Sequence, residues 1–289
     1  DAVRGVTPKK RTPVAEPSVT SLYSPVTIEQ ENSFLIIGER TNAMGSKAFR
    51  EAMLRADWDT CLKMATDQIR EGSHVLDVCV DYVGRDGTLD MNEIASRFAS
   101  KASVPLVLDS TETQVMEAGL QFAGGRCILN SANLEDGEGP GTRLDRVFRL
   151  ARDYGAAVIC LLIDERGQAR DVEWKMEVAH RLAKIAVEQY GLSTSDLIFD
   201  PLTFTLGTGA IEVVATSIVV HNVCADLPFP MDDDIVLGGR QPDQGGRGPG
   251  APTEPGDPPY IIGDVVVAPT IAKRQAEARE IPMDDEIAL

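Results

Sequence analysis

Six short, continuously apolar runs recur along this 289-residue chain, and they constrain its fold more than any other feature. They lie at 34–38, 75–80, 105–108, 127–129, 156–163 and 197–199. Runs of this length without polar alternation are typical of parallel strands that are buried on both faces. The segments between them are amphipathic, and several of these segments end in glycine, as helices often do. Six strand–helix units in series predict an α/β fold with a parallel sheet.

Polar residues follow every one of these runs, and their distribution separates two α/β architectures. The runs lead into GERTN, DVCVDYVGRDG, LDSTE, LNSAN, IDERGQ and FDPLTF. In an open doubly wound sheet the ligand groups concentrate at a switch point, whereas all strand ends of a (β/α)8 barrel converge on one mouth. Polar groups at all six ends favour a (β/α)8 TIM-type barrel. No GxGxxG follows the first run and GxxxxGK[ST] is absent, so a nucleotide-binding fold loses its main support.

The two ends of the chain differ from this repeating middle. Residues 1–33 are rich in Pro, Ser, Thr and Lys and show little periodicity, so we expect a linker or an extended arm. Six recognisable β/α units occupy residues 34–209. Residues 210–289 diverge, and the stretch 239–259 is Gly/Pro-rich and expected to be disordered. We therefore expect the last two β/α units of the barrel to be atypical or incomplete.

Charge and composition exclude several classes of function. The formal net charge of -17 disfavours binding to nucleic acid or to a membrane surface. The five cysteines are scattered and form no CxxC pair, which predicts reduced thiols and a cytoplasmic protein. The three histidines do not cluster with cysteines, so no protein-built zinc site is expected. No transmembrane helix and no signal peptide are expected, and the missing initiator Met suggests a fragment of a longer protein.

The polar residues at the strand ends form one candidate ligand-binding set. Its members are Glu39, Asn42, Asp77, Asp81, Asp109, Asn130, Asn133, Asp164 and Asp200. The set is acidic and amidic, with Arg40 and Arg85 as the nearby cations, which is the reverse of what a phosphate site needs. It suits either a divalent cation or a neutral heterocycle that carries an amino group beside a ring N–H. The alternative for each residue is a structural role in its own loop or turn.

Six motifs in a fixed order carry a resemblance to a known family. They are IGERTNAMGSKAF, LDVCVDYVGRDG, LDSTE, LNSAN, AAVICLLIDERGQA and IFDPLTFTLGTG. From about Ser21 to Gly209 the chain resembles the pterin-binding barrel of cobalamin-dependent methionine synthase, within the wider group of methyltetrahydrofolate-binding methyltransferases. Dihydropteroate synthase shares the barrel but has a different first-strand signature, so the resemblance to it is weaker.

This resemblance implies a function and assigns residues to it. It implies a barrel that binds 5-methyltetrahydrofolate at its mouth and presents the N5-methyl group to cob(I)alamin on another domain or protein. It implies that Asp109, Asn130 and Asp200 bond the edge of the pterin ring, with Glu39 and Asn42 lining the floor beside it. Asp81 is the remaining member of the substrate-binding set. The cobalamin-binding and homocysteine-binding domains of the full enzyme are the partners implied, because neither a zinc site nor a DxHxxG motif occurs in this chain.

The resemblance stops after TLGTG at 205–209. The family continues to a seventh strand that ends in G-x-S-N, and its Asn is expected to hydrogen-bond N5. Here DIVLGG at 234–239 has roughly the spacing of that strand, but Arg240 and Gln241 follow it, so no catalytic residue is assigned. YIIGDVVVAP at 260–269 is a candidate for strand eight. The tail is thus an out-of-frame translation, a fused segment, or a replacement for the last two units.

Three functions stay open from the sequence. The first is a folate-binding methyltransferase barrel that acts with a separate cobalamin protein. The second is a non-catalytic pterin-binding module or a defective fragment, because binding could survive the loss of the strand-seven Asn. The third is another barrel enzyme that uses the acidic mouth for a divalent metal.

Overall fold

The computed structural model describes residue 5, residues 16–30 and residues 35–202. The strands of the main sheet are β3 (Ile37–Gly38), β4 (Val75–Cys79), β5 (Leu106–Asp109), β6 (Ile128–Ala132), β7 (Ala157–Leu161) and β10 (Leu197–Asp200). The helices are α1 (Lys47–Leu54), α2 (Trp58–Arg70), α3 (Gly87–Lys101), α4 (Thr113–Phe122), α5 (Arg143–Tyr154) and α6 (Val172–Tyr190), with a 3-10 turn at Thr194–Asp196. Two antiparallel pairs complete the list, namely β1 (Ser18–Thr20) with β2 (Pro25–Thr27) and β8 (Ile163–Asp164) with β9 (Gly167–Gln168). Each of the six predicted apolar runs overlaps a strand of the main sheet.

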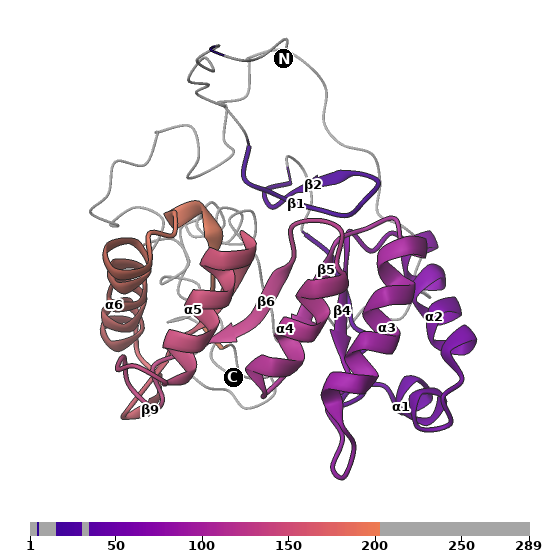
Figure 1. Cartoon of the computed structure of the whole chain (residues 1–289). Helices are drawn as coiled ribbons and strands as arrows, with labels where there is room; N and C mark the ends of the chain where they lie inside the picture. Colours follow the sequence, from indigo (N-terminus) through magenta and orange to yellow (C-terminus); the bar gives the residue numbers. More distant parts are fainter. Residues whose placement is uncertain (1–4, 6–15, 31–34, 203–289) are drawn as a thin grey trace, which may run out of the picture.

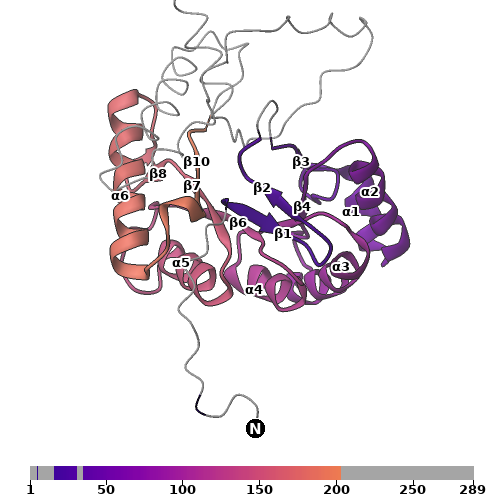
Figure 2. The same ribbon diagram turned by 90° about the horizontal axis from the view of Figure 1, so that it is seen from above.

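The main sheet is parallel throughout and follows the order of the chain. Its strand order is β10-β7-β6-β5-β4-β3, so consecutive strands are neighbours and β3 and β10 form its two edges in the described part of the chain. Figure 2 shows the strands along the inside of an arc, with the helices along the outside (Figure 1). A doubly wound sheet would carry helices on both faces. The fold is therefore the curled half of a (β/α)8-type barrel, as the polar strand ends predicted.

The helices begin where the sequence supplies a capping side chain. In five of them the residue before the helix accepts a hydrogen bond from the backbone N–H three residues further on. These residues are Ser46, Asp57, Asp86, Thr142 and Asp171. Each cap satisfies one of the N–H groups that a helix leaves unpaired at its start. These polar residues therefore have a structural role, since they stabilise the first turns of the helices.

Local backbone preferences set where the helices end. The predicted helical segment after the first strand is two helices, because Ala56 adopts a positive φ of 54° and Asp57 then caps α2. Gly155 and Gly191 follow α5 and α6 with φ of 69° and 70°, the left-handed region that glycine enters without strain. This confirms that these two glycines stop their helices.

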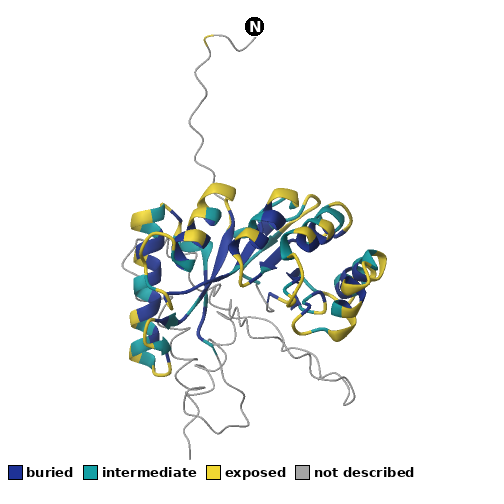
Figure 3. Cartoon of the chain, turned by 60° about the horizontal axis from the view of Figure 1, so that its bottom comes forward, coloured by how far each residue is buried: buried dark blue, intermediate teal, exposed yellow. Residues whose placement is uncertain are grey.

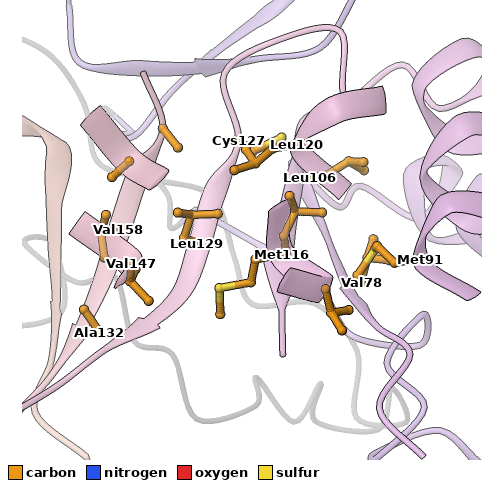
Figure 4. Packing of buried hydrophobic residues seen from close by; sticks show 14 of the residues in the cluster. Val78, Met91, Leu106, Met116, Leu120, Cys127, Leu129, Ala132, Val147 and Val158 are labelled. Atoms are coloured by element: carbon orange, nitrogen blue, oxygen red, sulfur yellow. The ribbon is translucent and has the colours of Figure 1, made fainter. Parts of the chain in front are cut away.

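A large apolar core fills the space between the sheet and the helices. Figure 4 shows Leu106 and Leu129 of the strands close to Met116 of α4, and Val158 of β7 close to Val147 of α5. All five side chains are buried. The helices cover this face of the sheet and a second core covers the other, so the strands have no solvent-facing side. This explains why the runs are continuously apolar.

The second core lies on the concave face of the sheet. It consists of Val19, Leu35, Ile37, Val75, Val107, Ile128, Ala157, Ile159 and Ile198. Most of these residues come from the first half of their strands, so the cluster fills the N-terminal end of the half-barrel. The strands in Figure 3 are accordingly buried, whereas the exposed residues lie on the outer sides of the helices and in loops.

A β-hairpin closes this N-terminal end. Figures 1 and 2 show β1 and β2 lying across the end of the sheet, and Val19 of β1 is fully buried in the inner core. Arg126, just before β6, fastens the hairpin: Nη1 donates to the Ser18 carbonyl at 2.8 Å, and its guanidinium pairs with Asp196. The Arg126 N–H donates to Thr20 Oγ1 at 2.7 Å. Residues 1–33 were expected to form a linker or an extended arm, and strands of three residues are too short to show an alternation that would reveal this hairpin.

Gly125 is the point where the hairpin approaches the barrel most closely, and Gly125→Ala should destabilise the fold. A Cβ at Gly125 would lie 2.1 Å from the Thr20 carbonyl oxygen, a backbone atom that hairpin pairing holds in place. We expect a loss of about 1–3 kcal/mol in the free energy of unfolding, typical of overpacking. Gly124→Ala is the matched control, since its Cβ would meet only the exposed side chain of Leu22, which can move. Urea unfolding of both variants checks this, and equal losses would contradict it.

One predicted strand proved wrong in its extent. The run 156–163 was expected to be a single strand, but β7 ends at Leu161 and the chain turns into the small β8–β9 hairpin. Gly167 adopts a φ of 108° in this hairpin, which favours glycine at that position. The sequence does not show where β7 ends, because Leu162 and Ile163 are both apolar and differ only in burial, Leu162 being buried and Ile163 half-buried.

The predicted tail lies outside the described residues. This applies to all of 210–289, including the strand candidates at 234–239 and 260–269 and the expected disorder at 239–259. The predicted last two β/α units lie outside them as well. In the part of the chain that is described, no helix is long and apolar enough to cross a membrane.

Candidate functional site

Four polar side chains stand on the concave face, each two residues beyond a member of the inner core. Asp77 follows Val75, Asp109 follows Val107, Asn130 follows Ile128 and Asp200 follows Ile198. Since alternate residues of a strand share a face, these side chains lie above the inner core, toward the C-terminal ends of the strands. The strand register makes Asp109 the direct neighbour of Asn130, and Cys79 that of Asp109. Four residues of the predicted ligand set thus share one surface.

Asn42 joins two of these carboxyl groups. Its Nδ2 donates to Asp77 Oδ2 at 2.6 Å and to Asp109 Oδ2 at 2.9 Å. Its Oδ1 accepts from the backbone N–H groups of Met44 at 2.8 Å and Gly45 at 3.2 Å. Both amide hydrogens and the amide oxygen are therefore engaged. Asn42 holds Asp77 and Asp109 in place beneath the barrel mouth, as a residue of the floor would.

Burial raises the pKa of both of these carboxyl groups. Burial raises the pKa of Asp109 to about 6, although the hydrogen bond from Asn42 opposes the rise. The pKa of Asp77 is raised well above its ordinary value by burial first, and then by the negative charges of Asp109 and Glu39. Asp77 Oδ1 is buried with no hydrogen-bond partner among the described residues. Near neutral pH Asp109 is therefore largely ionised, whereas burial and the neighbouring negative charges favour the protonated form of Asp77.

Asp81 faces the loop after β5 and not the concave surface. Its Oδ1 accepts from Ser110 Oγ at 2.7 Å. Its Oδ2 accepts from the backbone N–H and the hydroxyl of Thr111 at 2.8 and 2.9 Å. Both carboxylate oxygens are thus used within the protein. Asp81 thus holds the residues that follow Asp109, and its predicted contact with the substrate stays a prediction.

Asn130 and Asp200 differ in the hydrogen bonds that their side chains make within the protein. The half-buried Asn130 amide makes no side-chain hydrogen bond within the described part of the chain, so it can offer both a donor and an acceptor. Asp200 is buried, and its Oδ1 accepts from the Leu202 N–H at 2.8 Å. The turn after Asp200 is held by Lys175 of α6, whose fully buried Nζ donates to the Pro201 carbonyl at 2.5 Å.

The other members of the predicted set have different surroundings. Glu39 is half-buried just after β3, close enough to raise the pKa of Asp77. Asn133 is buried, and its Oδ1 accepts from the Glu135 N–H at 3.1 Å. Asp164 accepts from the Arg166 guanidinium and from the Trp174 indole N–H at 2.9 Å. Asn133 therefore bonds its own loop, whereas Asp164 bonds Arg166 of the β8–β9 turn and Trp174 of α6.

The nearby cation is not one that the sequence indicated. Arg40 pairs with Glu71 at the surface, and Arg85 pairs with Asp90 of α3. Instead Arg143, the first residue of α5, is close enough to Asp109 to lower its pKa. A positive charge at the first position of a helix is opposed by the helix dipole. That unfavourable placement, directly after the LNSAN loop region, is the sequence signal that could have revealed it.

Within residues 16–30 and 35–202, no group of three or more His, Cys, Asp or Glu side chains is arranged to hold a metal ion. The polar surface in that region consists of carboxyl groups, amides and one guanidinium. Such a surface can accept hydrogen bonds from N–H groups of a neutral ligand.

Comparisons with known proteins place this geometry in context. A family model described as pterin binding enzyme matches residues 38–219, more than half of the chain. The methionine synthase of Mycobacterium tuberculosis is 50% identical over 211 residues, which cover 73% of this chain and 18% of that protein. The methionine synthase of Mycobacterium leprae is 52% identical over 197 residues, 68% of this chain and 16% of that protein. The chain therefore spans only a small part of the length of these relatives.

Solved structures of dihydropteroate synthase share the fold. The enzyme from Xanthomonas albilineans with 4-aminobenzoic acid has a TM-score of 0.50 at 18% identity, covering 74% of this chain and 75% of that chain. Its complex with indole-2-carboxylic acid and 6-chloroguanine has a TM-score of 0.50 at 17% identity, with coverages of 73% and 74%. At such identities the likeness extends to the barrel-type fold alone.

Proposed function

We propose that the concave polar surface of this chain, which belongs to the family of pterin binding enzymes, binds the pterin ring of 5-methyltetrahydrofolate. The bound ring would present its N5-methyl group for transfer to cobalamin carried by another domain or protein. The similarity to two methionine synthases, of which this chain matches only a part, supports this division of labour. A homocysteine-binding domain would be a further partner in a longer protein.

The observation that carries the proposal is the pairing of Asp109 with Asn130 on adjacent strands of the concave face. A pterin ring has an amino group beside a ring N–H, and an ionised carboxylate can accept from both. The Asn130 amide can donate to a ring nitrogen or oxygen while accepting from a neighbouring N–H. Asp200, on the same face, supplies a second carboxyl group. Burial makes such contacts selective, because a ligand without the matching donors would leave Asp109 unpaired.

The position of the inner core supports a flat ring at this depth. Ile159 and Ile198 lie at the register level of Asn130 and provide apolar surface beside the polar groups. The acidic character of the surface disfavours burying an anionic group there. We therefore expect the ring to enter first and the glutamate end of the folate to stay toward the open mouth.

The chemistry that this chain would supply is orientation and hydrogen bonding. The methyl group leaves a tertiary amine, so N5 needs a proton or a hydrogen bond as the N–C bond breaks. Bound cob(I)alamin would supply the nucleophile, which is the cofactor's own chemistry. Asp109, Asn130 and Asp200 would hold the ring so that the methyl group faces the mouth. Contacts that strengthen as the ring becomes a leaving group would lower the barrier.

Calorimetric titration of the 289-residue chain with 5-methyltetrahydrofolate tests the binding. We expect saturable binding, whereas p-aminobenzoylglutamate, which has the tail but no pterin ring, should bind far more weakly. Equal affinities would place the contacts on the tail and contradict the proposal. A folded, monodisperse chain that gives no binding heat would contradict it as well.

A second assay separates a methyltransferase from a non-catalytic pterin-binding module. The absorbance of free cob(I)alamin is followed with 5-methyltetrahydrofolate, with and without the chain. Loss of the cob(I)alamin spectrum faster with the chain than without it would support methyl transfer. Tight folate binding without any such acceleration would support the binding module instead.

A further inference from the structure

Arg143 joins the two loops that follow Asp109 and Asn130. Its Nε donates to the Ser131 carbonyl at 2.8 Å, Nη1 to the Thr111 carbonyl at 2.7 Å and Nη2 to the Ser110 carbonyl at 2.9 Å. Ser110 and Thr111 come directly after Asp109, and Ser131 comes directly after Asn130. One planar guanidinium therefore fixes the backbone that directly follows each member of this neighbouring pair.

Two side chains hold the loop after Asp109, Asp81 by accepting hydrogen bonds and Arg143 by donating them. The Asp81 carboxylate accepts hydrogen bonds from the Ser110 hydroxyl and from the N–H and hydroxyl of Thr111. Arg143 donates to the carbonyls of Ser110 and Thr111. The Ser110 N–H donates to the Asn130 carbonyl at 3.3 Å. A carboxylate can only accept and a guanidinium can only donate, so neither residue could replace the other. The two together leave this loop few alternative arrangements.

Arginine suits this position in a way that lysine does not. Three carbonyls from two loops lie around one side chain, and the guanidinium offers a rigid fork of donors in a plane. An ammonium group is a single point with three mobile donors on a flexible stem. Burial lowers the pKa of Arg143, while Asp109, Asp136 and Asp81 oppose that change. The guanidinium thus remains a cation beside these carboxyl groups.

We propose that Arg143 is a positioning residue for the pterin site, which holds Asp109 and Asn130 at the spacing that the ring requires and keeps a positive charge beside Asp109. The inference rests on the proposed function, and it adds a residue and a role to it. Arg143 itself contacts backbone carbonyls and so acts through the two side chains that it positions.

The charge makes a second prediction about pH. The groups that act on Asp109 are Arg143 from α5, Asn42 from the loop after β3, and Asp77, Cys79 and Asp81 from β4 and the loop after it. Among these, Arg143 is the positive one. Its removal should leave Asp109 harder to ionise, so folate binding should weaken at a higher pH than in the wild-type chain.

The test compares Arg143→Met, Arg143→Lys and Arg146→Met with the wild type in calorimetric titrations with 5-methyltetrahydrofolate between pH 5 and 8. Arg143→Met should weaken binding about tenfold at pH 7.5 and move the acid midpoint of binding up by about one pH unit. Arg143→Lys keeps the charge but not the fork, so it should lose affinity without moving the midpoint. Arg146 is the matched control, since its side chain bonds the Gly141 carbonyl beside its own helix and no carbonyl of the two loops among the described residues. Its variant should bind like the wild type.

Amide hydrogen exchange supplies a readout that needs no ligand. Exchange in segments 110–112 and 131–133 should be faster in Arg143→Met and unchanged in Arg146→Met. Unchanged exchange, or faster exchange with unaltered affinity and midpoint, would overturn the positioning role. If Arg143→Met unfolds, Arg143→Lys decides: wild-type affinity and exchange in that variant would overturn the role of the fork. A wild-type chain that binds no folate contradicts the proposed function, and with it the inference, whatever the exchange shows.

Discussion

Asp109→Asn should weaken 5-methyltetrahydrofolate binding roughly a hundredfold or more and, at the same time, stabilise the ligand-free protein at pH 7. The loss of binding follows because an amide presents one acceptor and one donor where the ring offers two donors. The fold itself should tolerate the change, since the Asn side-chain oxygen can still accept from Asn42 Nδ2.

The gain in stability follows from the pKa of this carboxyl group. The folded state raises the pKa of Asp109 from 3.8 to about 6, so it holds the proton more tightly than the unfolded chain does. The free energy of unfolding therefore falls as the pH rises from about 4 to above 6, and at pH 7 the wild type carries the full penalty. Removing the charge should return on the order of 1–3 kcal/mol.

Thermal unfolding at pH 5 and pH 7, together with calorimetric titration, checks both parts. The advantage of the Asp109→Asn variant in melting temperature should be larger at pH 7 than at pH 5. Asp59→Asn, at an exposed position on α2, is the matched control and should change neither binding nor stability by much. Undiminished folate binding in Asp109→Asn would remove Asp109 from the site. A lower melting temperature at pH 7 would show that the charged form stabilises the fold.

Val19→Asp should destabilise the protein by about 3–5 kcal/mol, the range expected when an unpaired charge is forced into an apolar core. Val19 is fully buried against the inner core, and its neighbours there are aliphatic. The carboxylate can escape only if the β1–β2 hairpin leaves the barrel, and that would expose the inner core to water. In that case the end of the half-barrel opposite the proposed pterin site loses its cover.

The matched control for this variant is the same substitution at an exposed valine. Val83, in the loop after β4, is 95% exposed, so Val83→Asp should change the free energy of unfolding by no more than about 0.5 kcal/mol. Guanidinium unfolding compares the two, and limited proteolysis of residues 16–30 reports whether the hairpin has been released. Similar unfolding midpoints for the two variants would mean that the hairpin contributes little to the fold.

Much of the concave surface could be predicted from the sequence because it follows a local rule. VLDVC, LVLD, ILN and LIFD each place a polar residue two positions after an apolar one, and a strand puts such residues on the same face. Once the strands were known to be parallel and consecutive, Asp109 and Asn130 had to approach each other. The family model and the methionine synthase relatives agree with the family that the order of the motifs indicated.

Other features could not be predicted in this way, since they depend on contacts between distant segments. Asp81 resembled the other strand-end carboxyl groups, and only its three hydrogen bonds to Ser110 and Thr111 separate it from them. Arg143 lies in a helix with other arginines at nearby positions, and the sequence does not say which one turns inward. The hairpin at 16–30 becomes stable only by covering a core that other residues build.

The sequence by itself determined the parallel α/β fold, its helix starts and stops, and the acidic and amidic character of the barrel mouth. These properties follow from side-chain periodicity, capping and glycine conformation, all of which act over a few residues. Only the tertiary structure decided which carboxyl groups have a raised pKa, which ones bond neighbouring loops, and which cation stands beside Asp109. The physical reason is that burial and hydrogen bonding between residues tens of positions apart set a side chain's charge and its availability, and both arise only when the strands are assembled.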